Sequence, residues 1–195
     1  MDQSLADFNR YLELAPDRRN RLWERGIACY YAGDFQAGAD QFAAYQSFDG
    51  NDVENVVWQV ACLARASDFA TARRKILPVT RDRRVPMMQI YDLFRGTGTP
   101  EQVLEAAKAG TVPESQRTYH LFYAHLYLGL YFEIVGDTAQ AKSHLSRAAD
   151  EYRNDHYMWD VAKLHATRLR HPDNESPSVS LPSQRDTKPR RARED

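Results

Sequence analysis

A short turn motif recurs along this chain, and its spacing constrains the fold more than any other feature. The segments GDFQAG, SDFATA and GDTAQA begin at Gly33, Ser67 and Gly136, so the motif returns after 34 and then after 69 residues. Each copy lies between two stretches whose apolar or small residues recur at helical spacing. A fixed period of 34 residues is typical of repeated helical hairpins. The chain is therefore predicted to be all-α, a stack of helical hairpins without strands.

The residues of the motif have the chemistry that a joint between two helices requires. Asp34, Asp68 and Asp137 are predicted to cap the following helix by accepting hydrogen bonds from its free N–H groups. Gly33 and Gly136 provide the left-handed conformation that ends the preceding helix. Small residues stand where the helices of a hairpin must approach closely, and larger packing residues follow: the small ones are Gly26, Gly38, Ala72, Gly129 and Ala141, the larger ones Phe42, Ile76 and Leu145.

Further helices are predicted around these joints. They comprise a helix over residues 4–14, a shortened hairpin with one helix over 86–94 and another opened by the capping box at Thr99, a long helix to Val135, one from Thr138 to Tyr152, and a closing helix from Asp155, as its cap, to about Leu169. We count about nine helices in all. Residues 1–170 are predicted to form the repeat domain. Residues 171–195, rich in proline, serine and charge, are predicted to be a disordered tail.

Composition excludes several classes of function. The 195 residues include 26 Lys and Arg against 27 Asp and Glu, a net charge of -1, so nucleic acid is not expected as a partner. No apolar run approaches the roughly 18 residues that span a bilayer. The first residues carry acid rather than the basic and apolar regions of a secretory signal. Taken literally, the sequence predicts a cytoplasmic protein.

Residue types that carry catalysis or bind metals are present, but without the spacing that such sites need. No two of the six histidines stand three or four residues apart with an acidic partner, and His120 and His125 diverge around their helix. Cys29 and Cys62 occupy nearly equivalent places on successive first helices. They are predicted to be small buried residues, and a disulfide would need both to point along one seam. We predict no enzyme, no metal and no cofactor.

Aromatic residues indicate a binding surface instead. In a stack of helical hairpins the first helix of each pair lines the concave face. The predicted groove residues lie on such helices and are Trp23, Tyr30, Tyr31, Trp58, Tyr123 and Tyr127. Four tyrosines, at 119, 123, 127 and 131, recur at every fourth residue, and this spacing rotates each by about 40° from the last. Some of them must therefore face the core, and Tyr123 and Tyr127 are predicted to face the groove.

Two longer stretches resemble a known family. RGIACYYAGDFQAGADQFAAYQSFDGNDVENVVWQVACLAR, at residues 25–65, and the segments at 89–110 and 123–165 are similar to the NlpI-type tetratricopeptide lipoproteins of bacterial envelopes. The similarity covers about Leu5 to Leu169 and includes the irregular short hairpin. It implies a tetratricopeptide (TPR) solenoid that acts as a dimeric scaffold, presenting substrates to tail-specific proteases or gathering peptidoglycan hydrolases. The cell envelope is then the alternative location, if the true N-terminus lies upstream.

Two further surfaces are predicted. Leu5, Phe8 and Leu12 share one face of the first helix, and a symmetric homodimer would cover this face because both copies present the same patch. The run from Arg73 to Arg84 contains six basic residues and one acid. With the tail it gives an alternative function, a regulatory module that contacts an acidic or nucleic-acid partner. The main prediction is a non-catalytic scaffold that presents the aromatic groove to a protein or peptide.

Overall fold

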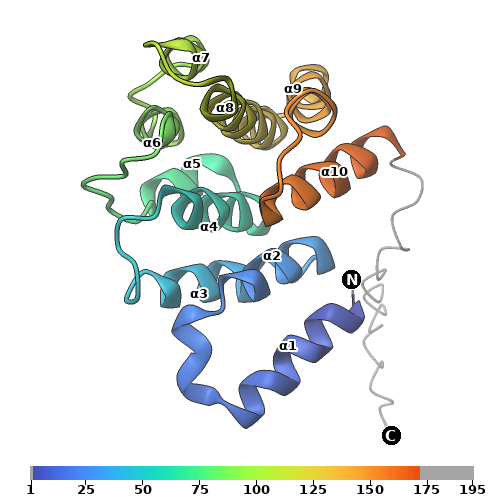
Figure 1. Cartoon of the computed structure of the whole chain (residues 1–195). Coiled ribbons are helices and arrows are strands. Elements are labelled where there is room, and N and C mark those ends of the chain that lie inside the picture. Colours follow the sequence, from blue (N-terminus) through green and yellow to red (C-terminus); the bar gives the residue numbers. More distant parts are fainter. Residues whose placement is uncertain (1, 172–195) are drawn as a thin grey trace, which may run out of the picture.

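Helices make up the regular structure in the part of the chain that the structure describes. The computed structural model describes residues 2–171, and these form ten α-helices and one 3-10 helix, with no strand (Figure 1). The elements are α1 (Asp2–Leu14), η1 (Pro16–Arg21), α2 (Trp23–Ala32), α3 (Phe35–Tyr45), α4 (Val53–Ala66), α5 (Phe69–Arg74), α6 (Met87–Arg95), α7 (Pro100–Lys108), α8 (Glu114–Val135), α9 (Thr138–Asp150) and α10 (Tyr157–Arg170). The all-α prediction is confirmed for these residues.

The predicted number of about nine helices was too low. The 3-10 helix η1 has the sequence PDRRNR and contains no buried residue, so no apolar periodicity marks it in the sequence. The closing helix also starts differently from the prediction, because His156 and not Asp155 is its cap. Asn154 Oδ1 accepts a hydrogen bond from the His156 N–H at 2.9 Å. This turn places the His156 ring, and not the Asp155 carboxylate, over the first N–H groups of α10.

The predicted helix caps are present at all three joints. The carboxylates of Asp34, Asp68 and Asp137 each accept a hydrogen bond from the backbone three residues later, at 3.3, 2.8 and 3.0 Å. Gly33 and Gly136 end α2 and α8 with φ angles of 82° and 87°. The capping box of Thr99 and Gln102 also forms, at the start of α7. These local predictions are confirmed.

Two glycines let paired helices touch. A Cβ atom built on Gly26 of α2 would stand 2.6 Å from the Phe42 ring of α3. A Cβ atom on Gly129 of α8 would stand 2.5 Å from Leu145 Cγ of α9 and 3.1 Å from the Leu145 backbone nitrogen. Distances this short leave no room for a methyl group. The pairs α2 with α3 and α8 with α9 therefore depend on a missing side chain.

Gly129→Ala is expected to lower the free energy of unfolding by about 1–3 kcal/mol, the usual cost of overpacking a filled core. The reason is that Leu145 Cγ and backbone both stand within the volume of the added methyl group. Urea denaturation measures the change. Gly50→Ala is the control, because its nearest contact would be 3.5 Å away. Wild-type stability in Gly129→Ala would mean that α8 and α9 are not closely packed.

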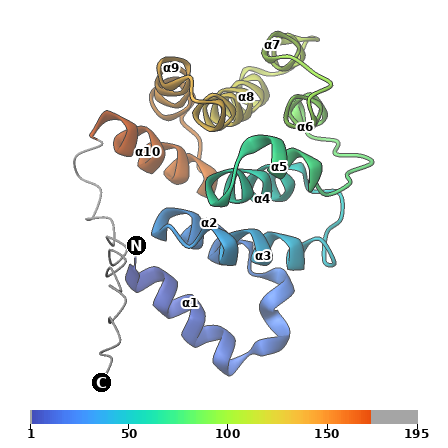
Figure 2. The ribbon, with the colours of Figure 1, turned by 180° about the vertical axis from the view of Figure 1, so that it is seen from behind.

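Consecutive helices pack against one another, and the last helix returns to an early one. In Figures 1 and 2, α10 lies beside α2 and the end of α4. The Tyr31 hydroxyl is 3.0 Å from His165 Nδ1, and Arg168 Nη1 donates to the Tyr31 carbonyl at 3.1 Å. The rings of Trp23 and Tyr157 meet edge to face with centroids 5.2 Å apart. Contacts between residues more than 130 positions apart therefore close the fold.

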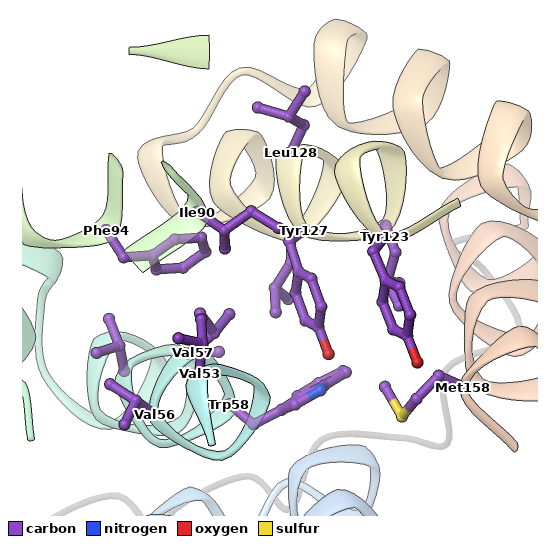
Figure 3. Close-up of a cluster of buried hydrophobic side chains, with 14 of the residues drawn as sticks. Val53, Val56, Val57, Trp58, Ile90, Phe94, Tyr123, Tyr127, Leu128 and Met158 are labelled. Carbon is purple, nitrogen blue, oxygen red and sulfur yellow. The ribbon is translucent and has the colours of Figure 1, made fainter. Parts of the chain in front are cut away.

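The main core lies between α4, α6 and α8. Figure 3 shows Trp58 of α4, Ile90 and Phe94 of α6 and Tyr127 of α8 converging, with Met158 of α10 at one side. All five side chains are 2% exposed or less. Among the described residues no helix has the length and apolar character needed to cross a membrane. The predicted disordered tail lies outside the described residues from position 172 onward.

Candidate functional site

A pocket opens where α4 meets α2, α3 and α10, with a volume of about 190 Å³. We call it the α4–α10 pocket. Its lining consists of two tryptophans, a phenylalanine, three polar residues at the start of α4, an arginine and the first residues of α10: Trp23, Phe42, Asp52, Glu54, Asn55, Trp58, Arg84, His156 and Met158. The lining combines aromatic walls with charged groups, which is the usual composition of a ligand site.

Three carboxylates surround the Arg84 guanidinium at the edge of this pocket. Arg84 Nη2 lies 2.6 Å from Asp52 and 2.5 Å from Asp82, and Nη1 lies 2.5 Å from Glu54 Oε1. A hydrogen bond to the backbone of α4 also holds the loop before α6 in place, because the Asp82 carboxylate accepts from the Val53 N–H at 3.3 Å. The loop thus carries Arg84 to the N-terminal end of α4.

The carboxyl group of Glu54 lies deep in the site. The Tyr127 hydroxyl donates a hydrogen bond to Glu54 Oε2, while Arg84 occupies the other oxygen. Burial raises the pKa of Glu54 to about 7, against the opposing effect of the Arg84 charge. At Asp82 burial also opposes ionisation, but the hydrogen bonds from Arg84 hold the pKa of that carboxyl below its usual value. The two carboxylates therefore respond differently to the same guanidinium.

Two side chains that line the pocket carry buried polar atoms without a partner. Trp58 is 2% exposed and Asn55 is 3% exposed. Trp58 Nε1 and Asn55 Oδ1 have no hydrogen-bond partner among the described residues, although the Asn55 amide nitrogen donates to the Phe42 carbonyl at 2.9 Å. An unpaired buried donor or acceptor is costly, so such atoms need an explanation. Here an unpaired donor and an unpaired acceptor belong to two residues that line the same pocket, and both atoms lie beneath its surface.

A second hollow adjoins the first on the other side of Arg84. We call it the Tyr119 hollow; its volume is about 610 Å³ and its lining residues are Arg83, Arg84, Val85, Ser115, Gln116, Tyr119, His120 and Tyr123. The Tyr123 hydroxyl is 3.4 Å from His156 Nδ1, a residue of the α4–α10 pocket. Arg84 lines both spaces. The two hollows together follow the surface from α10 to the start of α8.

The predicted groove residues separate into two groups. Trp23 is half-buried and lines the α4–α10 pocket with Trp58. Tyr123, 7% exposed, lines the Tyr119 hollow. Tyr127 is completely buried, so the prediction that its ring faces an open groove is wrong. As Figure 3 shows, the tyrosine rings at 123 and 127 extend in parallel from α8 toward Trp58 and Met158, and the Tyr127 hydroxyl is held by Glu54.

Tyr30 and Tyr31 lie in a buried network that joins four helices. Glu133 of α8 accepts hydrogen bonds from the Tyr30 hydroxyl at 3.2 Å and Arg65 Nη1 at 3.3 Å, and contacts His165 Nε2 at 2.8 Å. Both tyrosines are 5% exposed or less. They hold α2 to α8 and α10 rather than offering a surface. Nothing in the local sequence signals this network, since its members lie up to 134 positions apart.

The basic run between Arg73 and Arg84 is not one continuous cationic surface. Arg84 is paired with carboxylates. Arg73 donates to the Phe94 carbonyl at 3.1 Å, and its guanidinium lies 4.4 Å from the centre of the Phe69 ring. The two end residues of the run, Arg73 and Arg84, are therefore held by α6 and by the start of α4. The alternative function through this run and the tail stays a prediction.

The two cysteines lie close together in the interior. Cys29 and Cys62 are free and buried, and a Cβ on Gly38 would lie 2.7 Å from Cys62 Sγ and 3.3 Å from Cys29 Cβ. The prediction of two small buried residues is confirmed.

His125 and His144, which the sequence separates by 19 residues, meet with their Nδ1 atoms 2.8 Å apart. Among the residues that the structure covers, no group of three or more potential metal ligands is found.

The first helix carries the predicted dimer face. Leu5, Phe8 and Leu12 are half-buried, and α1 packs against α2 and η1. Tyr11 and Leu14 on the same helix are 45% and 72% exposed. The homodimer stays a prediction.

No model of a known protein family matches this chain.

Proposed function

We propose that the protein is a non-catalytic TPR-type scaffold that binds a partner protein or peptide at the α4–α10 pocket. The capped joints, at positions that repeat along the chain, support the TPR assignment. The close approach of paired helices at glycines supports it as well. In such proteins stacked hairpins form a rigid surface on which a partner segment lies.

One observation carries the proposal: the pocket wall holds a buried indole N–H and a buried amide oxygen without partners. Both atoms have almost no accessible surface of their own, so a bound segment with its own donors and acceptors would satisfy them by displacing the side chains that cover them. Buried polar atoms give an interface its specificity in this way. The half-buried Trp23 at the rim offers the aromatic surface that interfaces favour.

The chemistry of the pocket supports binding rather than bond making. Its charged groups are held by one another, with Arg84 between Asp52 and Glu54, and Glu54 is fixed on its other oxygen by Tyr127. A catalytic acid or base needs access to the proton that it moves. The resemblance to NlpI-type proteins suggests a protease or a cell-wall hydrolase system as the partner.

Trp23→Ala is expected to weaken partner binding at least tenfold, which is about 1.4 kcal/mol. The substitution should lower the free energy of unfolding by less than emptying a core site does. The Trp23 ring is only half-buried, and it packs edge to face against the ring of Tyr157. The tagged protein would be used to capture partners from an extract of the native organism. The captured protein, once purified, would be titrated calorimetrically against wild type and variant.

Trp159→Ala is the matched control for this experiment. Trp159 is also half-buried, but its indole N–H donates to the Ala149 carbonyl at 3.0 Å, away from the pocket lining. It should leave the binding constant unchanged. Equal binding by wild type and Trp23→Ala, or an equal loss in both variants, would contradict binding at this pocket.

A further inference from the structure

The charges around the α4–α10 pocket are unbalanced, and this imbalance restricts the ligand. Asp52, Glu54 and Asp82 surround the single guanidinium of Arg84 within 2.6 Å. Asp52 and Glu54 line the pocket, whereas Asp82 contacts Arg84 from outside the lining. If Glu54 is protonated, the two aspartates together still outweigh the charge of Arg84. His156, the remaining titratable group of the lining, has its pKa lowered by burial and by Arg84, so it adds no positive charge at neutral pH. The pocket is therefore acidic.

We propose that the α4–α10 pocket receives the cationic side chain, lysine or arginine, of an extended peptide segment. This inference rests on the proposed function and names the chemistry of the partner. A basic side chain gains from the unbalanced carboxylates in a partly desolvated site. An acidic or phosphorylated segment would be repelled by the same groups.

The walls of the pocket suit such a group. Trp23, the half-buried indole of the lining, stands at its rim, and indole rings are the preferred partners of ammonium and guanidinium groups. The volume of about 190 Å³ exceeds the roughly 150 Å³ of an apolar cavity that holds a benzene molecule. The space is thus sufficient for the end of one long side chain.

The two unpaired polar atoms fit a peptide better than a free cation. Asn55 Oδ1 is an acceptor and Trp58 Nε1 is a donor. Once the side chains that cover them are displaced, the first can take an N–H of the basic side chain and the second needs an acceptor. A peptide carbonyl beside the basic side chain provides that acceptor. An inorganic cation would leave the indole N–H unsatisfied.

The Tyr119 hollow gives the rest of the segment a path. It shares Arg84 with the pocket, and its lining includes the exposed side chains of Val85 and Tyr119, each 38% accessible. An apolar side chain next to the basic residue would contact these two. The recognised segment is therefore an extended peptide in which an apolar residue directly precedes or follows the basic residue.

Acetylated and amidated pentapeptides test this inference, with arginine, lysine, norleucine or glutamate at the centre of an otherwise alanine sequence. They would be titrated into ¹⁵N-labelled full-length protein while the indole N–H signals of the tryptophans are followed. The Trp58 indole signal is expected to shift with the arginine and lysine peptides. Binding of the norleucine peptide should be at least tenfold weaker, and raising the salt concentration should weaken the basic peptides selectively.

Asp52→Asn gives the sharpest variant. Asparagine caps a helix as well as aspartate does, so α4 should keep the cap that Asp52 provides to the Glu54 N–H while the pocket loses a charge. The affinity for the arginine peptide is expected to fall about five- to tenfold. Asp34→Asn is the matched control, since it makes the same change at the cap of α3, outside the pocket lining.

Three results would overturn the inference: a norleucine peptide that binds as tightly as the arginine peptide, a Trp58 signal that does not move with either basic peptide, or equal affinities in the two asparagine variants. The scaffold function is judged separately. Partner binding that depends on Trp23 but is insensitive to the basic peptides as competitors would leave the scaffold standing and the cationic ligand refuted.

Discussion

Tyr127→Ala is expected to lower the free energy of unfolding by about 3–5 kcal/mol, the range for emptying a buried aromatic site. The ring is completely buried between α4 and α8. Its removal also deprives Glu54 of a hydrogen-bond donor, and a buried carboxyl without its partner adds to the cost. Urea denaturation at pH 7 measures the change, which should exceed that of Trp23→Ala.

Tyr127→Phe separates the two parts of this effect. It keeps the ring and removes only the hydroxyl, so the loss is expected to be about 1–3 kcal/mol, the penalty for leaving one buried polar group unpaired. If Tyr127→Ala cost less than about 1 kcal/mol, the ring would not be a core element. The sequence-based assignment of Tyr127 to the binding groove would then be right after all.

The misassignment of Tyr127 has a physical origin in α8. Apolar side chains surround this helix, because it packs on α9 along one side and on α4, α6 and α7 along others. A helix that is apolar all round presents no stripe from which a buried face can be identified. The four-residue spacing of its tyrosines gave their relative rotation correctly, with Tyr119 exposed and Tyr127 buried. Which of the tyrosines faces the core is decided by the packing of α8 against its neighbouring helices.

Local features were predictable because their causes are local. The cap at Asp68 depends on one carboxylate and the N–H of Thr71, and both are set by three residues of sequence. The left-handed ends at Gly33 and Gly136 are likewise decided by one missing Cβ. The small residue at Gly129 indicated a close helix pair, and α8 and α9 make that pair.

The pocket could not be predicted in the same way. Asp52 and Arg84 are 32 positions apart, and His156 joins them only because α10 returns toward α2 and α4. In the sequence Arg84 is only the last member of the basic run at residues 73–84, for which a partner contact is predicted. A run of like charges does not reveal that one of its members is turned inward. Only the position of the loop against α4 does.

Two buried groups should give the stability of this protein an unusual dependence on pH. His125 is 1% exposed, and its Nδ1 lies 2.8 Å from Nδ1 of His144. One ring donates to the other in this contact, so neither needs a second proton. Burial, with the positive charges of Arg147 and Lys108 and the neighbouring His144, lowers the pKa of His125 to about 3. An unfolded histidine has a pKa of about 6.5.

The sign of the effect follows from where the proton binds. Between pH 6.5 and pH 3 the unfolded chain takes up a proton at His125 that the folded chain excludes. The contribution of His125 to stability is therefore lost as the pH falls through this window, at about 1.4 kcal/mol per pH unit. From pH 6.5 to pH 5 the loss is about 2 kcal/mol. The variant His125→Gln keeps a hydrogen-bonding side chain beside His144 but should not show this loss of stability.

Glu54 acts in the opposite direction. Its folded pKa of about 7 lies above the usual value of 4.5, so the folded chain holds a proton that the unfolded chain has released. Glu54 therefore stabilises the folded chain at low pH, and this contribution to the free energy of unfolding is lost as the pH rises from 4.5 to 7. The two groups partly cancel in the wild type, and a single pH curve cannot separate them. The differences between wild type and each variant can.

Urea denaturation of wild type, His125→Gln and Glu54→Gln at pH 7, 6 and 5 makes the separation. As the pH falls from 7 to 5, the free energy of unfolding of wild type should decrease by about 2 kcal/mol relative to that of His125→Gln. The reason is that only wild type has a histidine at this position, which binds a proton in the unfolded chain and not in the folded chain. The advantage of wild type over Glu54→Gln should grow, because the protonated carboxyl is favoured in the folded chain. Differences that stay constant with pH would show that both groups titrate as they do in the unfolded chain. In that case the burial of His125 and Glu54 would not govern the response to acid.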